Sequence, residues 1–335
     1  MSSFIVPTNY KSPLNLYETQ SAIGVMKDIF AKHLCNALNL KRVSAPLFVE
    51  PSTGLNDDLN GVERPVTFDI PDASIDAQVV HSLAKWKRLA LYRYGFKPGE
   101  GLYTDMNAIR RDEKLDNTHS VYVDQWDWEK VITADNRNTA YLWQTVELIV
   151  GAICDTLRDL KELFPTIDVN LERKVTFVTS QELEDKYPHL SPEERENMAA
   201  KEYKTIFVTG IGGKLKSGIP HGSRAPDYDD WDLNGDIIFW NDILGCAFEI
   251  SSMGIRVDSV SMEKQLTLSG KTERKKRMFH RMVLDGTLPL TIGGGIGQSR
   301  LSMLLLGKAH IGEVQSSVWD KETLLTAEKA GIVIL

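Results

Sequence analysis

Strand-like runs that follow one another along the chain, several without a helix between them, constrain the fold of this sequence more than any other feature. The runs are short and are bounded by turn-forming or helix-forming segments. This succession favours a mostly antiparallel central sheet flanked by helices, an α+β fold, over a doubly wound parallel sheet. The expected strands are residues 78–80, 102–104, 121–128, 175–178, 206–209, 236–240, 246–251 and 288–292.

Apolar residues at helical spacing mark several of the intervening segments. The first helix is expected over residues 15–40, and it leads into an extended segment at 43–49 around Pro46. A chain of 335 residues, 42% of them hydrophobic, can bury a large core. With no internal repeat or low-complexity linker, we expect a single domain spanning residues 1–335. Further helices are expected at residues 82–94, 138–164, 191–202, 258–268 and 298–306.

Charge and hydropathy argue against two classes of partner. The formal net charge of -7 disfavours a nucleic acid held by phosphate contacts. No stretch of roughly 18 uncharged apolar residues occurs, and Met1–Tyr10 lack the features of a signal peptide. We therefore expect a cytoplasmic protein without a membrane or nucleic-acid partner. The basic run Lys271–Arg277 is interpreted as a solvated helix face.

The three cysteines show neither the spacing of a zinc site nor that of a disulfide framework. Cys35, Cys154 and Cys246 are odd in number, lie far apart and form no CxxC pair. They are expected to be buried free thiols.

A glycine-rich segment near the end of the chain is the first candidate for a binding site. Residues Thr291–Leu306, TIGGGIGQSRLSMLLL, predict a strand end, a glycine loop and an apolar helix that carries Arg300 one turn in. Glycines let the backbone approach a ligand, and a helix N-terminus favours an anion such as phosphate. The segment is neither a Walker A loop nor a dinucleotide fingerprint. The alternative is that the glycines only allow tight packing between a strand and a helix. The presence of Arg300 argues against this alternative.

An arginine followed by a partly polar strand is the second candidate. Arg110 closes an extended segment, and after a polar loop the returning strand places Gln125, Asp127 and Glu129 on one face. A guanidinium beside such a face can bind a phosphate through two hydrogen bonds, while the face recognises an amine and a carboxylate. A solvent-exposed face with a surface ion pair is the alternative.

The densest acidic stretch, Asp227–Asp236, is close to a calcium-binding loop in its spacing. The twelfth position of such a loop requires a bidentate glutamate, but Asn241 stands there, and the residues before it are strand-like. An EF-hand is therefore excluded, and the carboxylates need another explanation.

Three segments, in the right order, resemble the motifs of class II aminoacyl-tRNA synthetases. The opening helix and the strand with Pro46 resemble motif 1, which forms the dimer interface in that superfamily. Residues 110–113 and 119–129 resemble motif 2, and residues 293–304 with Arg300 resemble motif 3. The resemblance implies the class II catalytic core and a homodimer.

Longer blocks resemble one family of that superfamily, the ammonia-dependent asparagine synthetases, also called aspartate-ammonia ligases. The likeness implies that ATP, with Mg²⁺, adenylates the side-chain carboxylate of aspartate, and that ammonia then displaces AMP to give asparagine. It covers nearly the whole chain. The blocks are HSLAKWKR (81–88), GEGLYTDM (99–106), SVYVDQWDWE (120–129), RAPDYDDW (224–231), LNGDI (233–237), FEISSMGIRV (248–257) and TIGGGIGQSR (291–300).

The resemblance also implies roles for single residues. Arg110 is expected at the α-phosphate and the reacting carboxylate, Arg300 at the γ-phosphate and departing pyrophosphate, and Asp229 at the substrate ammonium. Asp236 and Glu249 are expected to hold Mg²⁺, with structural ion pairing as the alternative for Asp236. The remaining expected contacts are Gly295 and Gly297 for ATP, Asp57 and Lys87 for catalysis, and Ser82, Gln125, Asp127, Arg224 and Ser252 for aspartate.

Two of these expectations leave alternatives open, and one segment departs from the family pattern. Lys87 lies on an expected helix with other basic residues, so an exposed basic face is its alternative. Any one of Asp57, Asp127 and Asp229 is a candidate to accept a proton from the attacking ammonium. The segment Lys214–Leu233 departs from the family pattern and predicts a shortened loop over the site, with Arg224, Asp229 and Asp236 in register.

Two rival functions follow from the same likeness. An aminoacyl-tRNA synthetase for aspartate, asparagine or lysine would carry an anticodon-binding barrel before motif 1, which begins here near residue 15. A regulatory paralogue that binds aspartate or a nucleotide would not need Arg110, Arg300 and Glu249. Free ammonia is the expected nitrogen donor, because a glutamine-dependent enzyme of the N-terminal nucleophile kind has a cysteine where Ser2 stands.

Overall fold

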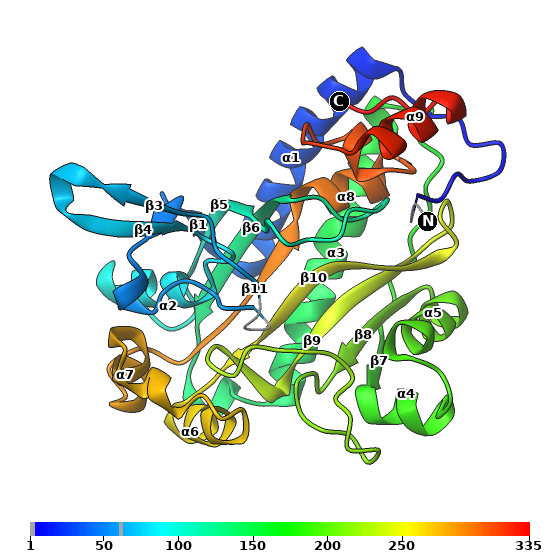
Figure 1. The fold of residues 1–335 in the computed structure, drawn as a ribbon. Coiled ribbons are helices and arrows are strands. Elements are labelled where there is room, and N and C mark those ends of the chain that lie inside the picture. The colour runs from blue at the N-terminus through cyan, green and yellow to red at the C-terminus, as the bar shows by residue number, and fades with distance from the viewer. Residues whose placement is uncertain (1–3, 60–62) are drawn as a thin grey trace.

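The protein is built around an eight-stranded sheet with the strand order β1-β5-β6-β11-β10-β9-β8-β7. The computed structural model describes residues 4–59 and 63–335, so Ser2 lies outside the described residues. Figure 1 shows helices packed around this sheet. Its strands are β1 (Leu40–Arg42), β5 (Gly101–Ile109), β6 (Tyr122–Val131), β11 (Thr291–Gly297), β10 (Cys246–Arg256), β9 (Asp229–Asn241), β8 (Thr205–Thr209) and β7 (Thr176–Thr179).

The central sheet is mixed, so the prediction of a mostly antiparallel sheet was wrong. β1 runs parallel to β5 at one edge, and β7 runs parallel to β8 at the other. Between β7 and β8 the helices α4 (Ser180–Lys186) and α5 (Pro192–Tyr203) carry the chain back along the sheet, and a connection of this length allows parallel pairing. The helix expected at 191–202 lay between two expected strands, so the sequence already contained this β-α-β unit.

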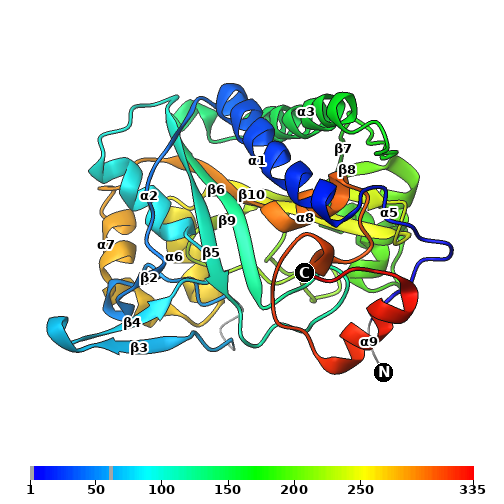
Figure 2. The same ribbon diagram turned by 90° about the horizontal axis from the view of Figure 1, so that it is seen from above.

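Two long helices lie side by side across one face of the sheet, as Figure 2 shows from above. They are α1 (Leu16–Leu38) and α3 (Thr139–Leu163). α1 begins after Asn15, whose side chain accepts a hydrogen bond from the Glu18 backbone N–H in a capping box. From Ala22 to Leu38 its buried side chains recur at every fourth position, and Phe30 packs against Trp126 of β6 with ring centroids 4.6 Å apart. The helix predicted from residue 15 is confirmed, and so is its apolar face.

Shorter elements complete the fold, and most of the expected ones are present within a few residues of their predicted ends. The expected strand at 43–49 forms only at its end. The elements α4, α7, α9, β1 and β3 were not predicted from the sequence. No helix in the described ranges is long and apolar enough to cross a membrane. The remaining elements are α2 (Ala84–Arg93), α6 (Ser259–Leu268), α7 (Met278–Leu284), α8 (Gln298–Leu305), α9 (Lys321–Ala330) and a three-stranded sheet of β2 (Phe48–Val49), β4 (Ile75–Val79) and β3 (Thr67–Ile70).

The three cysteines are free, as predicted, but each is only partly buried. Burial raises the pKa of the Cys154 and Cys246 thiols to about 11. Since the thiolate is the reactive form, these two side chains are expected to be unreactive at neutral pH.

His310 makes the stability of the fold depend on pH. Its ring is buried between Phe4 and Trp319, with centroid distances of 4.8 Å and 4.7 Å, and its Nδ1 accepts a hydrogen bond from the Gly312 N–H. Burial lowers the pKa of His310 to about 4, against a smaller raising effect of Asp116. Because this pKa lies below the ordinary value of 6.5, neutral His310 contributes its full stability above pH 6.5. That contribution is lost as the pH falls toward 4.

We expect the free energy of unfolding to fall by up to about 3 kcal/mol between pH 6.5 and pH 4 on account of this one group. His310→Gln should flatten that fall, because the amide keeps an acceptor for Gly312 and does not titrate. Urea unfolding at a series of pH values measures the difference. His189→Gln is the matched control, since His189 is exposed. If the free energy of unfolding falls equally with pH in wild type and in His310→Gln, the expectation is contradicted.

Candidate active site

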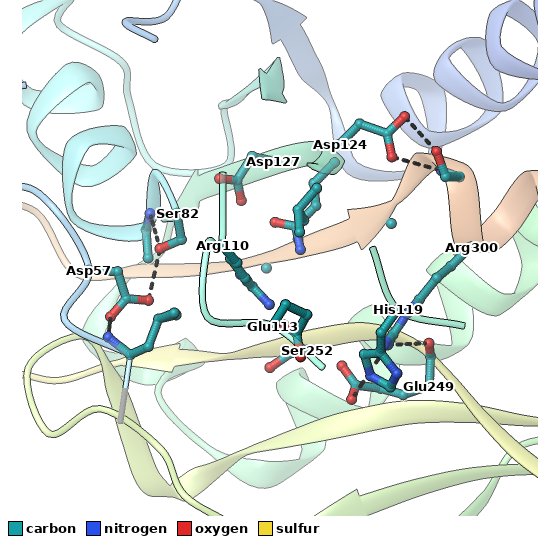
Figure 3. Close-up of a pocket in the computed structure, with 18 of the residues that line it drawn as sticks. Asp57, Ser82, Arg110, Glu113, His119, Asp124, Asp127, Glu249, Ser252 and Arg300 are labelled. Atoms are coloured by element: carbon teal, nitrogen blue, oxygen red, sulfur yellow. Dashed lines mark hydrogen bonds and ion pairs between the residues drawn. The ribbon is translucent and has the colours of Figure 1, made fainter. Parts of the chain in front are cut away.

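A cavity of about 430 Å³ lies over the middle strands of the central sheet (Figure 3). Strands β6, β10 and β11 form part of its walls, together with the β5-β6 loop and the segments that precede α2 and β9. The structure brings the predicted site residues together here, with Asp236 as the exception that does not border the cavity. Those at its walls are Asp57, Ser82, Lys87, Arg110, Gln125, Asp127, Arg224, Asp229, Glu249, Ser252, Gly295, Gly297 and Arg300.

The glycine-rich segment is strand β11, so the prediction of a loop was wrong. Gly293 pairs with Glu129 of β6, and Gly295 pairs with Asp127. A Cβ atom at Gly293 would overlap the Glu129 carboxylate, and one at Gly295 would overlap the Gln125 amide. Glycine is needed because side chains of the neighbouring strand lie across β11. The absence of side chains at Gly293 and Gly295 therefore lets β6 present its polar groups to the cavity.

Arg110 follows directly on β5 and is fixed by its own backbone. Its N–H donates to the Val121 carbonyl at 2.8 Å, and its carbonyl accepts from the Glu113 N–H at 3.0 Å. In the part of the chain that the structure describes, no group accepts a hydrogen bond from its buried Nε atom. A buried donor of this kind normally has a partner. The side chain extends into the cavity, where a ligand oxygen can supply that partner (Figure 3).

Arg300 reaches the same cavity from the first turn of α8. Its Nη1 donates to the Glu249 carbonyl at 3.1 Å and its Nε to the Thr118 carbonyl at 3.3 Å. The guanidinium also lies 5.9 Å from the centre of the Phe248 ring. These contacts fix the direction of the side chain, which keeps 23% of its surface exposed for further hydrogen bonds.

Lys87 is fully buried, which excludes the exposed basic face considered for it. Its Nζ donates to the Asp127 carboxylate, to the Trp128 carbonyl at 2.9 Å and to the Gly294 carbonyl at 3.0 Å. Burial lowers the pKa of this ammonium, and Asp127 opposes the effect. Three partners use all three ammonium protons. In this structure, Lys87 therefore orients Asp127 and joins α2 to β11.

Asp57 and Ser82 form one polar corner of the cavity. The Ser82 hydroxyl donates to Asp57 Oδ2 at 3.0 Å, and the Leu59 N–H donates to Oδ1 at 2.9 Å. Asp57 is buried, with 2% of its surface exposed. Its carboxylate is therefore held in place before any ligand binds.

A buried ion network supports the floor of the cavity, and of its members only Asp229 was among the predicted site residues. Arg256 of β10 donates from Nε and Nη2 to Glu129 and from Nη1 to Asp229. The Thr291 hydroxyl also donates to Glu129 at 2.6 Å. Burial raises the pKa of Asp229, while Arg256 and Arg224 lower it. Two buried carboxylates thus share one guanidinium.

Arg224 joins strands β9 and β10 at the cavity wall. It donates to Asp236 at 2.6 Å and to the Ser252 hydroxyl, and it lies 3.9 Å from Asp229. Burial raises the pKa of Asp236, and although Arg224 opposes this, the nearby Glu249 adds to it. Asp236 is therefore engaged in an ion pair, which agrees with the structural alternative considered for it.

Two further polar groups at the walls were missed. His119, in the β5-β6 loop, pairs with Asp116 through Nδ1 at 2.9 Å. Asp124 accepts hydrogen bonds from the Ser299 N–H at 3.0 Å and the Ser299 hydroxyl at 2.8 Å, at the start of α8. His119 could have been found from its place in the same polar loop as Arg110. Asp124 could not, because strand alternation placed it on the opposite face from Gln125 and Asp127.

A divalent metal ion at this cavity would need oxygen ligands from carboxylates, phosphates or water. The described residues contain no group of three or more His, Cys, Asp or Glu side chains that could hold one. Glu249 borders the cavity with 43% of its side chain exposed, whereas Asp236 is bonded to Arg224. Mg²⁺ often binds one or two carboxylates and takes its other ligands from phosphates and water. The site therefore fits a magnesium ion that arrives with a nucleotide.

The sequence matches the model of the aspartate-ammonia ligase family over residues 17–331. The chain belongs to this family. Aspartate-ammonia ligase of Clostridium tetani is 57% identical over 332 residues, covering 99% of this chain and 97% of its own length. That of Lactobacillus johnsonii is 56% identical over 337 residues, covering 99% and 100%. The resemblance drawn from the sequence blocks is confirmed.

Solved structures with low sequence identity share the fold of this family member. Asparaginyl-tRNA synthetase of Pyrococcus horikoshii, complexed with asparaginyl-adenylate, aligns with a TM-score of 0.66 at 17% identity, covering 89% of this chain and 68% of its own. The Entamoeba histolytica asparaginyl-tRNA synthetase aligns with a TM-score of 0.65 at 12% identity, covering 90% and 66%. The fold is thus that of class II aminoacyl-tRNA synthetases. This chain spans about two-thirds of their length.

Proposed function

We propose that this cavity is where the chain makes asparagine from aspartate, ammonia and ATP through a β-aspartyl-adenylate. The overall conversion is the activity of the aspartate-ammonia ligase family, to which the chain belongs. The assignment of this reaction to the cavity is supported above all by Arg110, whose buried Nε faces the cavity without an acceptor among the described residues. The expected single catalytic domain, homodimer, cytoplasmic location and lack of a nucleic-acid partner belong to the same proposal.

The first step makes the side-chain carboxylate of aspartate reactive. A carboxylate oxygen attacks the α-phosphorus of ATP, and the bond to pyrophosphate breaks. Negative charge grows on the α-phosphate, where Arg110 is placed to donate hydrogen bonds that strengthen in the transition state. Arg300 takes the γ-phosphate and the departing pyrophosphate. Glu249, with Asp236 if Arg224 releases it, would hold Mg²⁺, which neutralises phosphate charge when bound.

The second step joins ammonia to the acyl carbon, and AMP leaves with the electron pair of the broken bond. The attacking nitrogen loses a proton, for which Asp57, Asp127 and Asp229 are the candidate acceptors at the cavity. We assign the α-ammonium to carboxylates of this group, and the α-carboxylate to Arg224 with Ser252. Ser82 and Gln125 supply neutral hydrogen bonds, and Lys87 keeps Asp127 in place.

The test is an assay on the purified protein with ATP, Mg²⁺, aspartate and ammonium. We expect asparagine, AMP and pyrophosphate in equal amounts, with glutamine unable to replace ammonium. ADP and phosphate as products would contradict the adenylate. Absence of asparagine would favour the regulatory paralogue, and tight retention of tRNA on a filter would favour the synthetase.

A further inference from the structure

The basic run Lys271–Arg277 contains a buried arginine. Residues Thr272–Lys276 form the 3-10 helix η4, which leads into α7. Arg274 exposes only 4% of its surface. The interpretation of the run as a solvated helix face was therefore wrong at this position, and the buried guanidinium needs its own explanation.

Arg274 joins two carboxylates from distant parts of the chain. Its Nη1 donates to Asp227 Oδ2 at 2.8 Å, and its Nη2 lies 2.9 Å from Asp58 Oδ2. Asp227 is fully buried and is also contacted by Lys85 at 3.4 Å and His280 at 2.9 Å. The planar guanidinium suits this bridge, because its donors point in fixed directions toward two acceptors.

Both carboxylates stand next to cavity residues. Asp58 directly follows Asp57, and Asp227 precedes Tyr228 and Asp229; these last two border the cavity, as Asp57 does. Arg274 itself does not border it. The bridge therefore fixes the distance between two acidic walls of the site without touching the space that they enclose.

We propose that Arg274 is a positioning residue for aspartate binding, which sets the spacing between the segments that carry Asp57 and Asp229. The proposal rests on the assignment of these carboxylates to the α-ammonium of aspartate. On the other side, Asp227 keeps its contacts to Lys85 and His280, and Asp229 keeps its contact to Arg256. Asp58 keeps a weaker partner, the partly exposed Arg277 at 3.2 Å, so loss of the bridge mainly frees the Asp57 side. A displacement there weakens aspartate binding and leaves the nucleotide contacts of Arg110 and Arg300 unchanged.

The main test variant is Arg274→Lys, because a lysine keeps the charge but cannot span both carboxylates. We expect KM for aspartate to rise on the order of tenfold, with KM for ATP and kcat within about twofold of wild type. Asp58→Asn should give the same result from the other end of the bridge. Asp58 has 35% of its side chain exposed, so this variant is expected to fold even if Arg274→Lys does not.

Lys275→Met is the matched control, because Lys275 lies on the same helical turn and, among the residues that the structure describes, pairs only with the exposed Glu263. Its kinetic constants should equal those of wild type. Thermal unfolding of each variant reports whether it is folded. An unchanged KM for aspartate in folded Asp58→Asn would overturn the proposal. So would equal rises in KM for aspartate and ATP, or a loss of kcat alone.

Asp57→Asn separates this proposal from the proposed function. If Asp57→Asn raises KM for aspartate but Asp58→Asn does not, only the role of Arg274 fails. If Asp57→Asn leaves KM for aspartate unchanged, the assignment of Asp57 to the substrate fails, and the proposal for Arg274 fails with it.

Discussion

Arg110→Met is expected to lower kcat/KM for asparagine formation by about a thousandfold, because single arginines or preorganised donors at transition-state charge contribute factors of this size. Like Arg224, the cavity residue Arg110 has a buried Nε without an acceptor among the described residues; unlike Arg224, Arg110 forms no ion pair with a carboxylate in that part of the chain. Its removal therefore leaves no buried carboxylate without a partner. We expect the melting temperature of the variant to stay close to that of wild type.

Coupled pyrophosphate release and direct asparagine measurement test this expectation together with thermal unfolding. Arg111→Met is the matched control, since the neighbouring side chain is exposed and does not border the cavity. It should keep full activity. Arg110→Met with more than about a tenth of wild-type kcat/KM would remove Arg110 from the transition state.

Arg256→Met is expected to destabilise the fold by about 3 to 5 kcal/mol, because it leaves buried carboxylates without their charge partner. Glu129 and Asp229 expose 0% and 1% of their surfaces, and Arg256 contacts both. Lys87 lies 3.9 Å from Glu129 and already spends its protons on three other acceptors, so it offers little compensation. Arg256→Lys should also be destabilising, since lysine cannot reproduce the two-pronged contact to Glu129.

Denaturant unfolding at neutral pH measures the loss of stability in the two Arg256 variants. Arg158→Met is the matched control: this arginine has 61% of its side chain exposed and pairs with Asp155 and Asp159 at the surface. Its loss should change the free energy of unfolding far less than the loss of Arg256 does, because exposed ion pairs contribute little to stability. Equal stability losses in the two variants would show that the buried network contributes no more than a surface pair.

The list of cavity residues was largely available from the sequence. Gln125 and Asp127 were grouped by strand alternation, Arg110 by its place at the end of the preceding extended segment, and Arg300 by its place one turn into a helix. The other members came from the likeness of whole sequence blocks to a family. Family membership then accounts for the overall reaction, while the part that each side chain plays in it is still a proposal.

The burial of single side chains was predicted less well than the set of residues that line the cavity. Lys87 and Arg274 both lie in basic stretches that look solvent-exposed from their neighbours, yet both are buried. Their partners come from distant parts of the chain: Asp127 for Lys87, and Asp58 and Asp227 for Arg274. Local charge patterns carry no information about such partners, and a buried cation is tolerated only when it has them.

The sequence by itself determined the elements that depend on local periodicity and local chemistry. The apolar spacing of residues 15–40 and 138–164 was enough to predict α1 and α3, because a helix places residues three and four apart on one face. Likewise, Arg110 at the end of an extended segment and Arg300 one turn into a helix after a glycine-rich segment were enough to predict a site for an anionic ligand.

Only the tertiary structure decided the features that depend on which segments meet. The parallel edges of the sheet follow from the path of the chain between strands, and the glycines of β11 are required by Glu129 and Gln125 of a neighbouring strand. The same holds for the bridge from Arg274 to Asp58 and Asp227. In each case the energy comes from groups far apart in the sequence, whose contact is created by folding itself.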